Sequence, residues 1–380
     1  MQHLITIFLS CVLLSHTVAA STATEPDPEA IRIIEEFGLS ESEAPAASLP
    51  NWQPQRVVVS LPPSLSKRLP GLEEKLVATA GEVELVIDRS ENFILSSEVL
   101  AGTDAIIGIC TPPTIGNASE RLLWVHNYSV GMDRCAGLPP EQLEGRVFTN
   151  NKRLSGPAIA EHSIAMMLSL AKGLPAYQRA QSQSQWDRSL AGQVQFGEIK
   201  GKTLLVVGLG GIGTQIAWRA HGLGMRVIAT RNSSREGPDY IDYVGLADEL
   251  ITLAAQADVV VNALPLTDKT SGLFDQAFFD KVKPGAIFLS VGRGKSTVTV
   301  DLVAALESGK LYGAGLDVTD PEPLPADNPL WQMSNVIITP HASAAGRDSI
   351  KRTAVIAVEN LRRYLAGERL LNVVNMRAGY

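Results

Sequence analysis

The chain has 380 residues, of which 45% are hydrophobic and 19% charged, so the composition excludes a disordered chain and is typical of globular domains. The 33 lysines and arginines against 40 aspartates and glutamates give a net charge of −7 without a basic stretch, which argues against nucleic acid as a partner. The length suits two domains of ordinary size.

The first twenty residues predict a targeting segment. Residues 4–14 are an apolar run too short to span a bilayer, and Val18-Ala19-Ala20 offers small residues at a cleavable position. This pattern is typical of a secretory signal peptide, although the positive charge before the apolar run is weak and no twin arginine is present. We expect export to the periplasm or the medium, with no stable membrane span after signal removal. An uncleaved anchor, or a cytoplasmic protein with a misassigned start, is the alternative.

Residues 21–55 make an acidic lead-in in which one short helix is expected. Asp27 is placed to cap this helix, Pro28 suits its first turn, and Gly38 can end it. Its buried face would carry Ile31, Ile34 and Phe37.

Short apolar strands alternate with helical patterns from Arg56 onward. In the first part we predict strands at 57–59, 84–87, 105–110, 122–125 and 147–150, with a helix at 72–80. A long helix at 158–180 should bridge two domains. Strands at 204–207, 227–229, 259–261, 286–289 and 336–338 follow, and a last helix at 344–365 should pack back on the first domain.

Strands separated by helices predict βαβ units and parallel sheets. The fold class is therefore α/β, with two Rossmann-like domains. Residues 154–340 would form a domain inserted into another that comprises residues 56–153 and 341–380.

A glycine-rich turn predicts a dinucleotide site in the inserted domain. Gly208-Leu209-Gly210-Gly211-Ile212-Gly213 fits G-x-G-x-x-G and lies between a predicted strand and a helical pattern. Glycines there allow a tight turn and a close approach of the backbone to pyrophosphate, at a helix end that carries free N–H groups. The residues expected to bind the cofactor are Gly208, Gly210, Gly211, Ile212 and Gly213.

The end of the next strand predicts which dinucleotide is bound. An acid there would accept hydrogen bonds from the adenosine ribose, but this chain has Thr230-Arg231-Asn232-Ser233-Ser234-Arg235. Guanidinium groups suit a 2′-phosphate, so we expect NADP(H) in preference to NAD(H), with contacts from Arg231, Ser233 and Arg235. Solvated surface arginines are the alternative interpretation.

Three separated motifs supply a cation, a carboxylate and an imidazole. Val291-Gly292-Arg293-Gly294 follows one strand, Glu322-Pro323 follows the segment Gly313–Val318, and Thr339-Pro340-His341 follows the last strand. Open α/β sheets bind ligands at the carboxyl ends of their strands. We therefore expect Arg293 to grip a substrate carboxylate and polarise the carbonyl beside it.

In this order the motifs resemble the D-isomer-specific 2-hydroxyacid dehydrogenase family, in particular its glyoxylate/hydroxypyruvate reductase-like members. The resemblance also includes Leu264–Thr270, Leu316-Asp317-Val318, the substrate-loop-like Gly131-Met132-Asp133 and the closing segment Asn372–Asn375, and it covers roughly residues 56–376. Ser290 and Ala344 depart from the common family pattern.

The resemblance implies a role for each matching residue. Arg293 would bind the substrate carboxylate and keto oxygen, His341 would exchange a proton with that oxygen, and Glu322 would hydrogen-bond the imidazole. The backbone N–H groups of Ser129, Val130 and Gly131 would bind the carboxylate from its other side. Further cofactor contacts are implied for Leu264, Pro265, Thr270, Val291, Gly292 and Asp317, the last near the nicotinamide amide. A homodimer formed through the cofactor domain is also implied.

Together these observations predict NADPH-dependent reduction of a small anionic 2-keto acid, such as glyoxylate or hydroxypyruvate, to the D-2-hydroxy acid. The alternatives are a phosphoglycerate dehydrogenase-like enzyme and a non-catalytic dinucleotide-sensing protein on the same fold. The predicted export conflicts with the cytoplasmic synthesis of nicotinamide cofactors.

The cysteines and histidines outside the motifs above show no pattern of a metal site, so we predict none. Cys110 and Cys135 are expected to be small buried hydrophobic residues, with one disulfide as the alternative, and His162 is expected to be structural. No His, Cys and Asp cluster has metal-ligand spacing.

Overall fold

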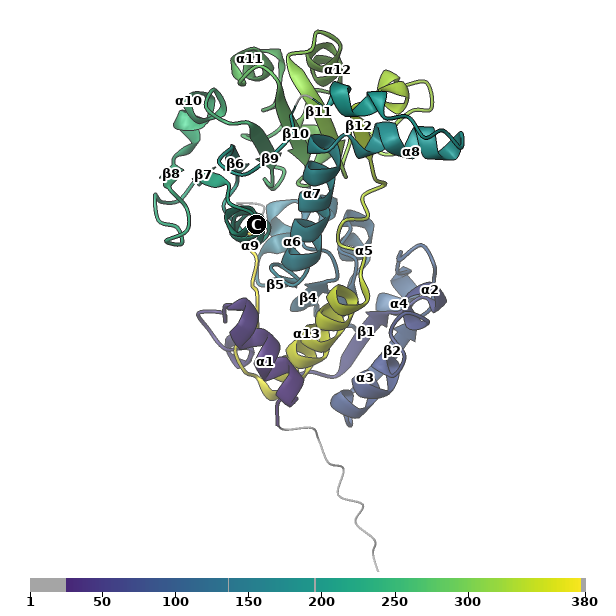
Figure 1. Ribbon diagram of the computed structural model, residues 1–380. Coiled ribbons are helices and arrows are strands. Elements are labelled where there is room, and N and C mark those ends of the chain that lie inside the picture. Colours follow the sequence, from purple (N-terminus) through teal and green to yellow (C-terminus); the bar gives the residue numbers. More distant parts are fainter. Residues whose placement is uncertain (1–24, 136, 195, 377–380) are drawn as a thin grey trace, which may run out of the picture.

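The computed structural model describes residues 25–135, 137–194 and 196–376. The predicted signal peptide therefore lies outside the described residues. The chain forms two lobes, each built around a parallel sheet, with α7 (Gly156–Ala171) running from one lobe to the other (Figure 1). The predicted α/β class with two Rossmann-like domains is confirmed.

The first lobe contains a five-stranded sheet in the order β2-β1-β3-β4-β5. Its strands are β1 (Arg56–Ser60), β2 (Glu84–Asp88), β3 (Ala105–Gly108), β4 (Trp124–Asn127) and β5 (Val147–Asn150). Its helices are α2 (Pro63–Ser66), α3 (Leu72–Ala80), α4 (Ser97–Leu100), α5 (Pro112–Gly116) and α6 (Pro140–Leu143). The central strands are continuous apolar runs because helices cover both faces of a parallel sheet.

The second lobe contains a seven-stranded sheet in the order β12-β11-β10-β9-β6-β7-β8. Its strands are β6 (Thr203–Val207), β7 (Arg226–Thr230), β8 (Tyr243–Gly245), β9 (Val259–Asn262), β10 (Ala286–Ser290), β11 (Leu311–Leu316) and β12 (Val336–Ile338). Its helices are α9 (Gly211–Gly222), α10 (Leu250–Ala254), α11 (Gln276–Lys281) and α12 (Thr299–Glu307). The chain winds outward from β6 in both directions, so the turn after β6 lies at the switch point where such sheets bind ligands.

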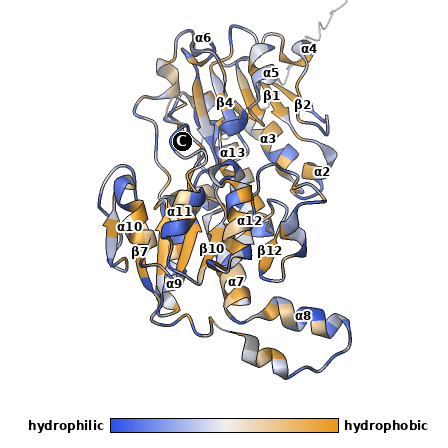
Figure 2. Cartoon of the chain, turned by 90° about the horizontal axis from the view of Figure 1, so that it is seen from above, coloured by the Kyte–Doolittle hydropathy of each residue, from blue (hydrophilic) through white to orange (hydrophobic). Residues whose placement is uncertain are grey.

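Two strands of the second sheet were not predicted. β11 was missed because Gly313 and Gly315 interrupt its apolar pattern, and β8 is only three residues long. Hydrophobic residues nevertheless concentrate in the strands of this sheet (Figure 2). In the first lobe, β4 begins two residues later than predicted, at Trp124.

The prediction of one continuous helix at 158–180 is wrong. α7 ends at Ala171, and Gly173 adopts a left-handed conformation with φ 65°, after which α8 (Leu174–Ser182) takes a new direction. Figure 2 shows α8 projecting from the second lobe as an arm. A residue in the left-handed region cannot continue a right-handed helix, and glycine adopts that region without steric cost.

The last helix, α13 (Arg347–Ala366), returns to the first lobe and packs on α3. Its residues Ala357, Leu361 and Tyr364 are buried in the core of that lobe, where Tyr364 stacks on Trp124. Within the residues that the structure describes, no helix is long and apolar enough to cross a membrane.

The acidic lead-in is folded onto α13. Its helix α1 (Pro28–Phe37) has the predicted Asp27 cap and ends at Gly38 in the left-handed conformation. The predicted buried face is partly wrong, because Ala30 and Ile33 are buried whereas Ile31 is 42% exposed. The cause is tertiary packing. The face of α1 that is buried is the one that contacts Leu154 and two apolar residues of α13, Val355 and Ile356.

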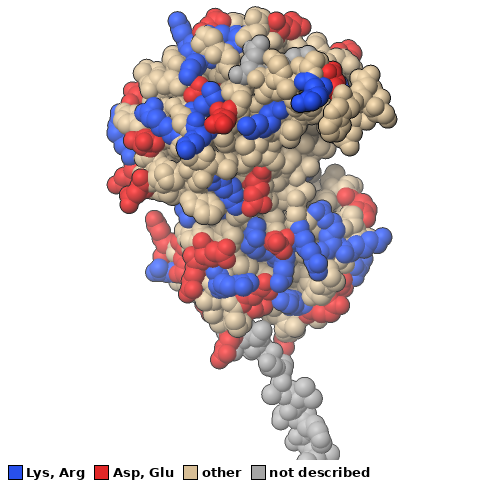
Figure 3. All heavy atoms as spheres, in the orientation of Figure 1, with Lys and Arg blue, Asp and Glu red and all other residues tan. Residues whose placement is uncertain are grey.

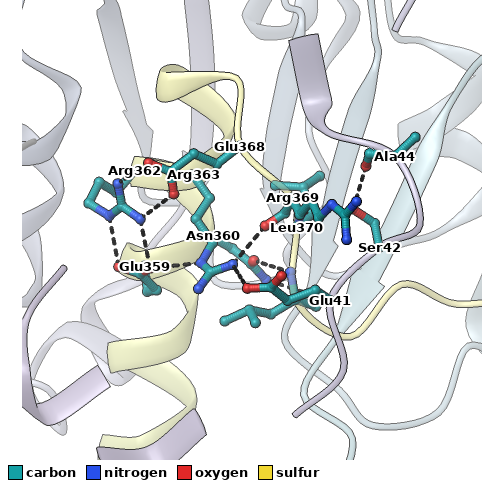
Figure 4. A network of polar contacts seen from close by, with 11 residues as sticks. Glu41, Ser42, Ala44, Glu359, Asn360, Arg362, Arg363, Glu368, Arg369 and Leu370 are labelled. Atoms are coloured by element: carbon teal, nitrogen blue, oxygen red, sulfur yellow. Dashed lines mark hydrogen bonds and ion pairs between the residues drawn. The ribbon is translucent and has the colours of Figure 1, made fainter. Parts of the chain in front are cut away.

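An ion-pair network fixes the segment after α1 to the end of α13 (Figure 4). The Glu41 carboxylate lies 2.7 Å from Arg363, and Arg363 also binds Glu359 at 2.7 Å. Arg362 joins the same Glu359 carboxylate at 2.9 Å and Glu368 at 2.6 Å. Glu359 is only 2% exposed, and the two arginines compensate the charge of its buried carboxylate.

Candidate active site

The three predicted catalytic residues follow three adjacent parallel strands. Arg293 comes after β10, Glu322 after β11 and His341 after β12, and these strands are neighbours in the sheet. The strand ends are in register, because Ser290 pairs with Leu316 and Leu316 with Ile338. The three loops therefore leave the sheet side by side.

Close contacts join these loops. The imidazole Nδ1 of His341 lies 3.0 Å from the Glu322 carboxylate, and the other Glu322 oxygen accepts the N–H of Thr319 at 3.1 Å. Thr319 in turn abuts the arginine loop, since a Cβ on Gly294 would lie 1.7 Å from the Thr319 carbonyl oxygen. The structure thus brings the acid and imidazole together and places the arginine loop against them.

The His341–Glu322 contact assigns the imidazole tautomer. A carboxylate can only accept, so Nδ1 carries the proton in this contact and Nε2 is the nitrogen left to exchange a proton with a substrate. The His341 side chain is 49% exposed and that of Glu322 40% exposed, so both can be reached.

Arg293 reaches across to the first lobe. Its Nε lies 2.9 Å from the Asp133 carboxylate, and its Nη1 donates to the Gly292 carbonyl at 2.9 Å. Burial raises the pKa of Asp133, but the charge and hydrogen bond of Arg293 lower it more, so the pKa of this carboxyl lies below its ordinary value. Gly131 is required here, because a Cβ on it would lie 1.6 Å from Nη2 of Arg293.

Asparagine side chains hold the predicted substrate loop. Asn127 donates from Nδ2 to the carbonyls of Ser129 at 3.2 Å and Gly131 at 3.0 Å, and Asn150 donates to the Val130 carbonyl at 2.6 Å. In a trans peptide the N–H points opposite to the preceding carbonyl. The N–H groups of Val130 and Gly131 therefore face away from these asparagines, as a carboxylate site requires.

Cys110 and Cys135 are buried as expected, but a disulfide joins them, so the alternative of one disulfide holds. Cys110 follows β3, and Cys135 ends a 3-10 turn at Asp133–Cys135 after the neighbouring strand β4. Sheet pairing brings these two loops together, with Cα atoms 5.4 Å apart, a separation that suits a disulfide. The bond anchors the turn that carries Asp133.

The glycine turn after β6 fits a dinucleotide. A Cβ on Gly213 would lie 2.1 Å from the Gly208 carbonyl oxygen, so only glycine allows α9 to pack this closely on the turn. In contrast, a Cβ on Gly210 would meet nothing within 4 Å. No side chain caps the start of α9, so its first N–H groups, including that of Ile212, are available to a pyrophosphate.

The loop predicted to bind the 2′-phosphate has contacts of its own. Arg231 donates to the Glu236 carbonyl at 3.0 Å. Arg235 binds the Glu249 carboxylate at 2.6 Å and the Tyr243 hydroxyl at 2.8 Å. Ser233 lies in the same turn. Glu249 is therefore a carboxylate partner that competes with a phosphate for Arg235.

Other predicted cofactor residues line the same edge of the sheet. A Cβ on Gly292 would lie 2.5 Å from the Leu264 carbonyl oxygen, so the loop with Val291 and Gly292 meets the loop with Leu264 and Pro265. The Thr270 hydroxyl donates to the Pro265 carbonyl at 2.7 Å and so stabilises that loop.

Asp317 holds the turn that carries His341. Its carboxylate is 1% exposed and accepts the N–H of Ala342 at 2.8 Å, the N–H of Ser343 at 3.1 Å and the Ser343 hydroxyl. Its second role in binding the nicotinamide amide stays a prediction.

Sequence reasoning missed three residues of this site. Asp133 was quoted within the loop motif without a role, although its place beside Gly131 was a usable signal. Thr339 was likewise quoted within the histidine motif without a role, because its bond to Asp317 joins loops that only folding brings together. Asn127 gave no signal, although its bond to Gly131 spans only four residues.

Two cavities lie along α7. One of about 540 Å³ is an apolar groove between α7 and α9, and the other, of about 480 Å³, separates the starts of α7 and α13. Figure 3 shows the surface hollowed at the waist between the lobes. Across residues 25–135, 137–194 and 196–376, no group of three or more His, Cys, Asp or Glu side chains could hold a metal.

Comparison with known proteins agrees with this geometry. Residues 164–343 match the NAD-binding domain of D-isomer specific 2-hydroxyacid dehydrogenases. The glyoxylate/hydroxypyruvate reductase B of Enterobacter sp. (strain 638) is 38% identical over 219 residues, which are 57% of this chain and 67% of that protein. For another curated relative, from Corynebacterium melassecola, the match spans 59% of its length.

Solved structures match over most of this chain. A D-isomer specific 2-hydroxyacid dehydrogenase family protein from Aeromonas salmonicida is 33% identical, with a TM-score of 0.70, and the match covers 84% of this chain and 99% of that one. The NADPH-dependent glyoxylate/hydroxypyruvate reductase of Sinorhizobium meliloti, solved with NADP and sulfate, is 26% identical with a TM-score of 0.70, covering 86% and 100%.

The fold and the site together define a two-domain α/β protein with a nicotinamide dinucleotide-binding domain. The chain belongs to the D-isomer specific 2-hydroxyacid dehydrogenase family. Proteins of this family are NAD(P)-dependent oxidoreductases that act on the CH–OH group of their donors.

Proposed function

We propose that this protein reduces a small 2-keto acid, such as glyoxylate or hydroxypyruvate, to the D-2-hydroxy acid with NADPH. The observation that carries the proposal is the His341–Glu322 contact at 3.0 Å, on strand ends next to the loop of Arg293. An imidazole oriented by a carboxylate beside a guanidinium is the arrangement that carbonyl reduction of an acid requires.

Each group has a separate task. Arg293 uses Nε and Nη1 for Asp133 and Gly292, which leaves Nη2 to bind the substrate. The N–H groups of Val130 and Gly131 bind the carboxylate. His341, with a proton on each ring nitrogen, gives its Nε2 proton to the keto oxygen and keeps its Nδ1 proton in the hydrogen bond to Glu322. A dihydronicotinamide dinucleotide held by the glycine turn after β6 would supply the hydride. A proton taken up from the solvent then restores His341, whose ring Glu322 holds in place.

The preference for NADP(H) rests on the end of β7. Residues 230–235 contain no acid that would repel a 2′-phosphate, and the Arg231 side chain donates to a carbonyl of its own loop. The Sinorhizobium relative, with the same fold, was solved with NADP. NAD(H) is the competing cofactor.

The test is a substrate panel with both cofactors. Glyoxylate, hydroxypyruvate, pyruvate and 3-phosphohydroxypyruvate are each supplied with NADPH or NADH, and the product is resolved on a chiral column. We expect the highest kcat/KM with NADPH and glyoxylate or hydroxypyruvate, and a D product from hydroxypyruvate. Preference for the phosphorylated acid would favour the phosphoglycerate-type alternative. Dinucleotide binding without any turnover would favour the sensor.

Dimerisation through the second lobe is part of the proposal. The apolar groove between α7 and α9 is lined by Ile164, Leu168 and Trp218, and Trp218 is 56% exposed. Trp186, which follows the projecting α8, is 94% exposed. Large apolar surfaces of this kind mark protein interfaces. Light scattering should give a dimer for the parent and a monomer for Trp218→Glu; a monomeric parent would refute the interface.

Export is proposed from two independent features. The signal-like pattern of residues 1–20 is one, and the Cys110–Cys135 disulfide is the other, because disulfides persist in oxidising compartments. Residues 1–20 fused to alkaline phosphatase, which is active only after export, should give phosphatase activity. An inactive fusion of normal abundance would favour the cytoplasm.

A further inference from the structure

His341 occupies a backbone conformation that the surrounding chain must hold. Its φ is 51°, in the left-handed region that a histidine adopts only when other contacts compensate. The compensating contacts come from Asp317: its carbonyl accepts the His341 N–H at 2.8 Å, and its carboxylate accepts the N–H groups of Ala342 and Ser343. The placement of the imidazole therefore depends on the placement of the Asp317 carboxylate.

A hydroxyl and a second imidazole extend this arrangement. The Thr339 hydroxyl donates to Asp317 Oδ1 at 2.7 Å, and Nε2 of His162 lies 2.9 Å from the same hydroxyl oxygen. A hydroxyl has one proton, and here that proton goes to the carboxylate. His162 must therefore donate from Nε2, which assigns its tautomer and gives the contacts one direction, from His162 to Thr339 to Asp317.

We propose that His162 is a positioning residue, which acts through Thr339 and Asp317 to hold the turn that carries His341. His162 lies on α7, 177 residues from Thr339 in the sequence, so the contact ties the interlobe helix to the catalytic turn. This proposal goes beyond the proposed reductase activity and rests on it for its kinetic test.

The surroundings of His162 indicate that its bond to Thr339 does more than give a buried ring a hydrogen-bond partner. Its ring is half-buried and borders the cavity of about 480 Å³ between the starts of α7 and α13, which Ser343 and Arg347 also line. A ring at the edge of such a polar cavity can be hydrated, so solvation alone does not require a bond to Thr339. The bond instead orients Thr339 toward Asp317.

The kinetic test compares His162→Leu with His162→Gln. Leucine removes the donor, whereas the glutamine amide restores an N–H at a similar reach. We expect His162→Leu to lower kcat about tenfold, because the loss of one hydrogen bond lets the imidazole leave its productive position. The KM for the keto acid and the Kd for the dinucleotide should stay within about twofold of the parent, and His162→Gln should recover most of kcat.

A double-mutant cycle tests the path. Thr339→Val breaks the chain between His162 and Asp317, so His162→Leu should have no further effect on kcat in the Thr339→Val background. Glu161→Gln is the matched control, since Glu161 is the neighbour on α7 that lines the same cavity, is itself exposed and pairs with Arg219. Equal losses in kcat for His162→Leu and Glu161→Gln, or additive losses with Thr339→Val, would overturn the proposal.

A spectroscopic test of the contact does not depend on catalytic turnover. In ¹⁵N-histidine-labelled protein, the His162 ring, identified by its absence in His162→Gln, should carry its proton on Nε2, and Thr339→Val should shift that resonance. A proton on Nδ1, or an unchanged resonance in Thr339→Val, would overturn the inference. If the parent shows the Nε2 tautomer but reduces no keto acid, the proposed reductase activity fails while the contact stands. Circular dichroism establishes that each variant is folded.

Discussion

Arg293 of the second lobe and Asp133 of the first lobe meet at 2.9 Å across the boundary between the lobes. The residues are 160 positions apart in the sequence, and each is supported from its own side, Arg293 by the Gly292 carbonyl and Asp133 by the turn that ends at the disulfide. The ion pair thus aligns the guanidinium before a substrate arrives, which reduces the cost of ordering it on binding.

Asp133→Ala should therefore impair substrate binding. The side chain of Arg293 would lose its partner, and we expect kcat/KM for the keto acid to fall roughly tenfold, mainly through KM, because a hydrogen bond between charged groups contributes about 1.5–3 kcal/mol. Asp133→Asn keeps an acceptor for Nε and should give an intermediate loss. Steady-state kinetics measure both. A lower KM in Asp133→Ala would mean that Asp133 mainly repels the substrate anion.

Arg231→Asp should shift the cofactor preference towards NAD. The change replaces a cation by an anion where the 2′-phosphate is expected, so the ratio of NADP to NAD affinity should fall tenfold or more, roughly the weight of one charge-assisted hydrogen bond. Titration of nucleotide fluorescence gives both affinities. Arg235→Ala should have a smaller effect because Glu249 already binds Arg235. An unchanged ratio in Arg231→Asp would refute the phosphate contact.

Removal of the disulfide should lower stability. Cys110 and Cys135 close a loop with a sequence separation of 25, for which the loss of chain entropy in the unfolded state corresponds to roughly 3 kcal/mol. The variant with both residues changed to Ser should unfold at lower temperature and lower urea concentration than the parent. A denatured chain without residues 1–20 should show no free thiol until it is reduced. Two reactive thiols without reductant would contradict the bond.

Stability should also fall in acid because of His126. This side chain is fully buried, its Nδ1 lies 2.9 Å from the Thr149 hydroxyl oxygen, and burial lowers its pKa from 6.5 to about 4. Because the folded pKa lies below the unfolded one, the unfolded chain binds the extra proton. The free energy of unfolding should therefore be unaffected by His126 above about pH 6.5, and should fall by roughly 3 kcal/mol as the pH drops towards 4.

Urea unfolding at about pH 7 and pH 4.5 measures this effect. His126→Asn keeps an acceptor for Thr149 but cannot titrate, so its stability should change less with pH than that of the parent. His221→Asn is the matched control, because His221 lies at the exposed end of α9. Parallel losses in the parent and His126→Asn would show that other groups cause the acid sensitivity.

The sequence by itself determined the parts of this protein that depend on local spacing. The glycine turn, most strands and the order of the arginine, glutamate and histidine motifs could be read directly, because short-range periodicity and backbone requirements leave a pattern within a few residues. The resemblance to the family, and not the order of the strands, implied the His341–Glu322 contact, because β11 was not predicted.

Only the tertiary structure decided which distant side chains meet. The Asp133–Arg293 pair, the Cys110–Cys135 bond and the His162–Thr339 contact each join elements far apart in the sequence, and no local pattern records such a meeting. The break at Gly173 and the face that α1 buries were decided in the same way. Packing selects among conformations that local preference leaves nearly equal, so these features become fixed only when both lobes are assembled.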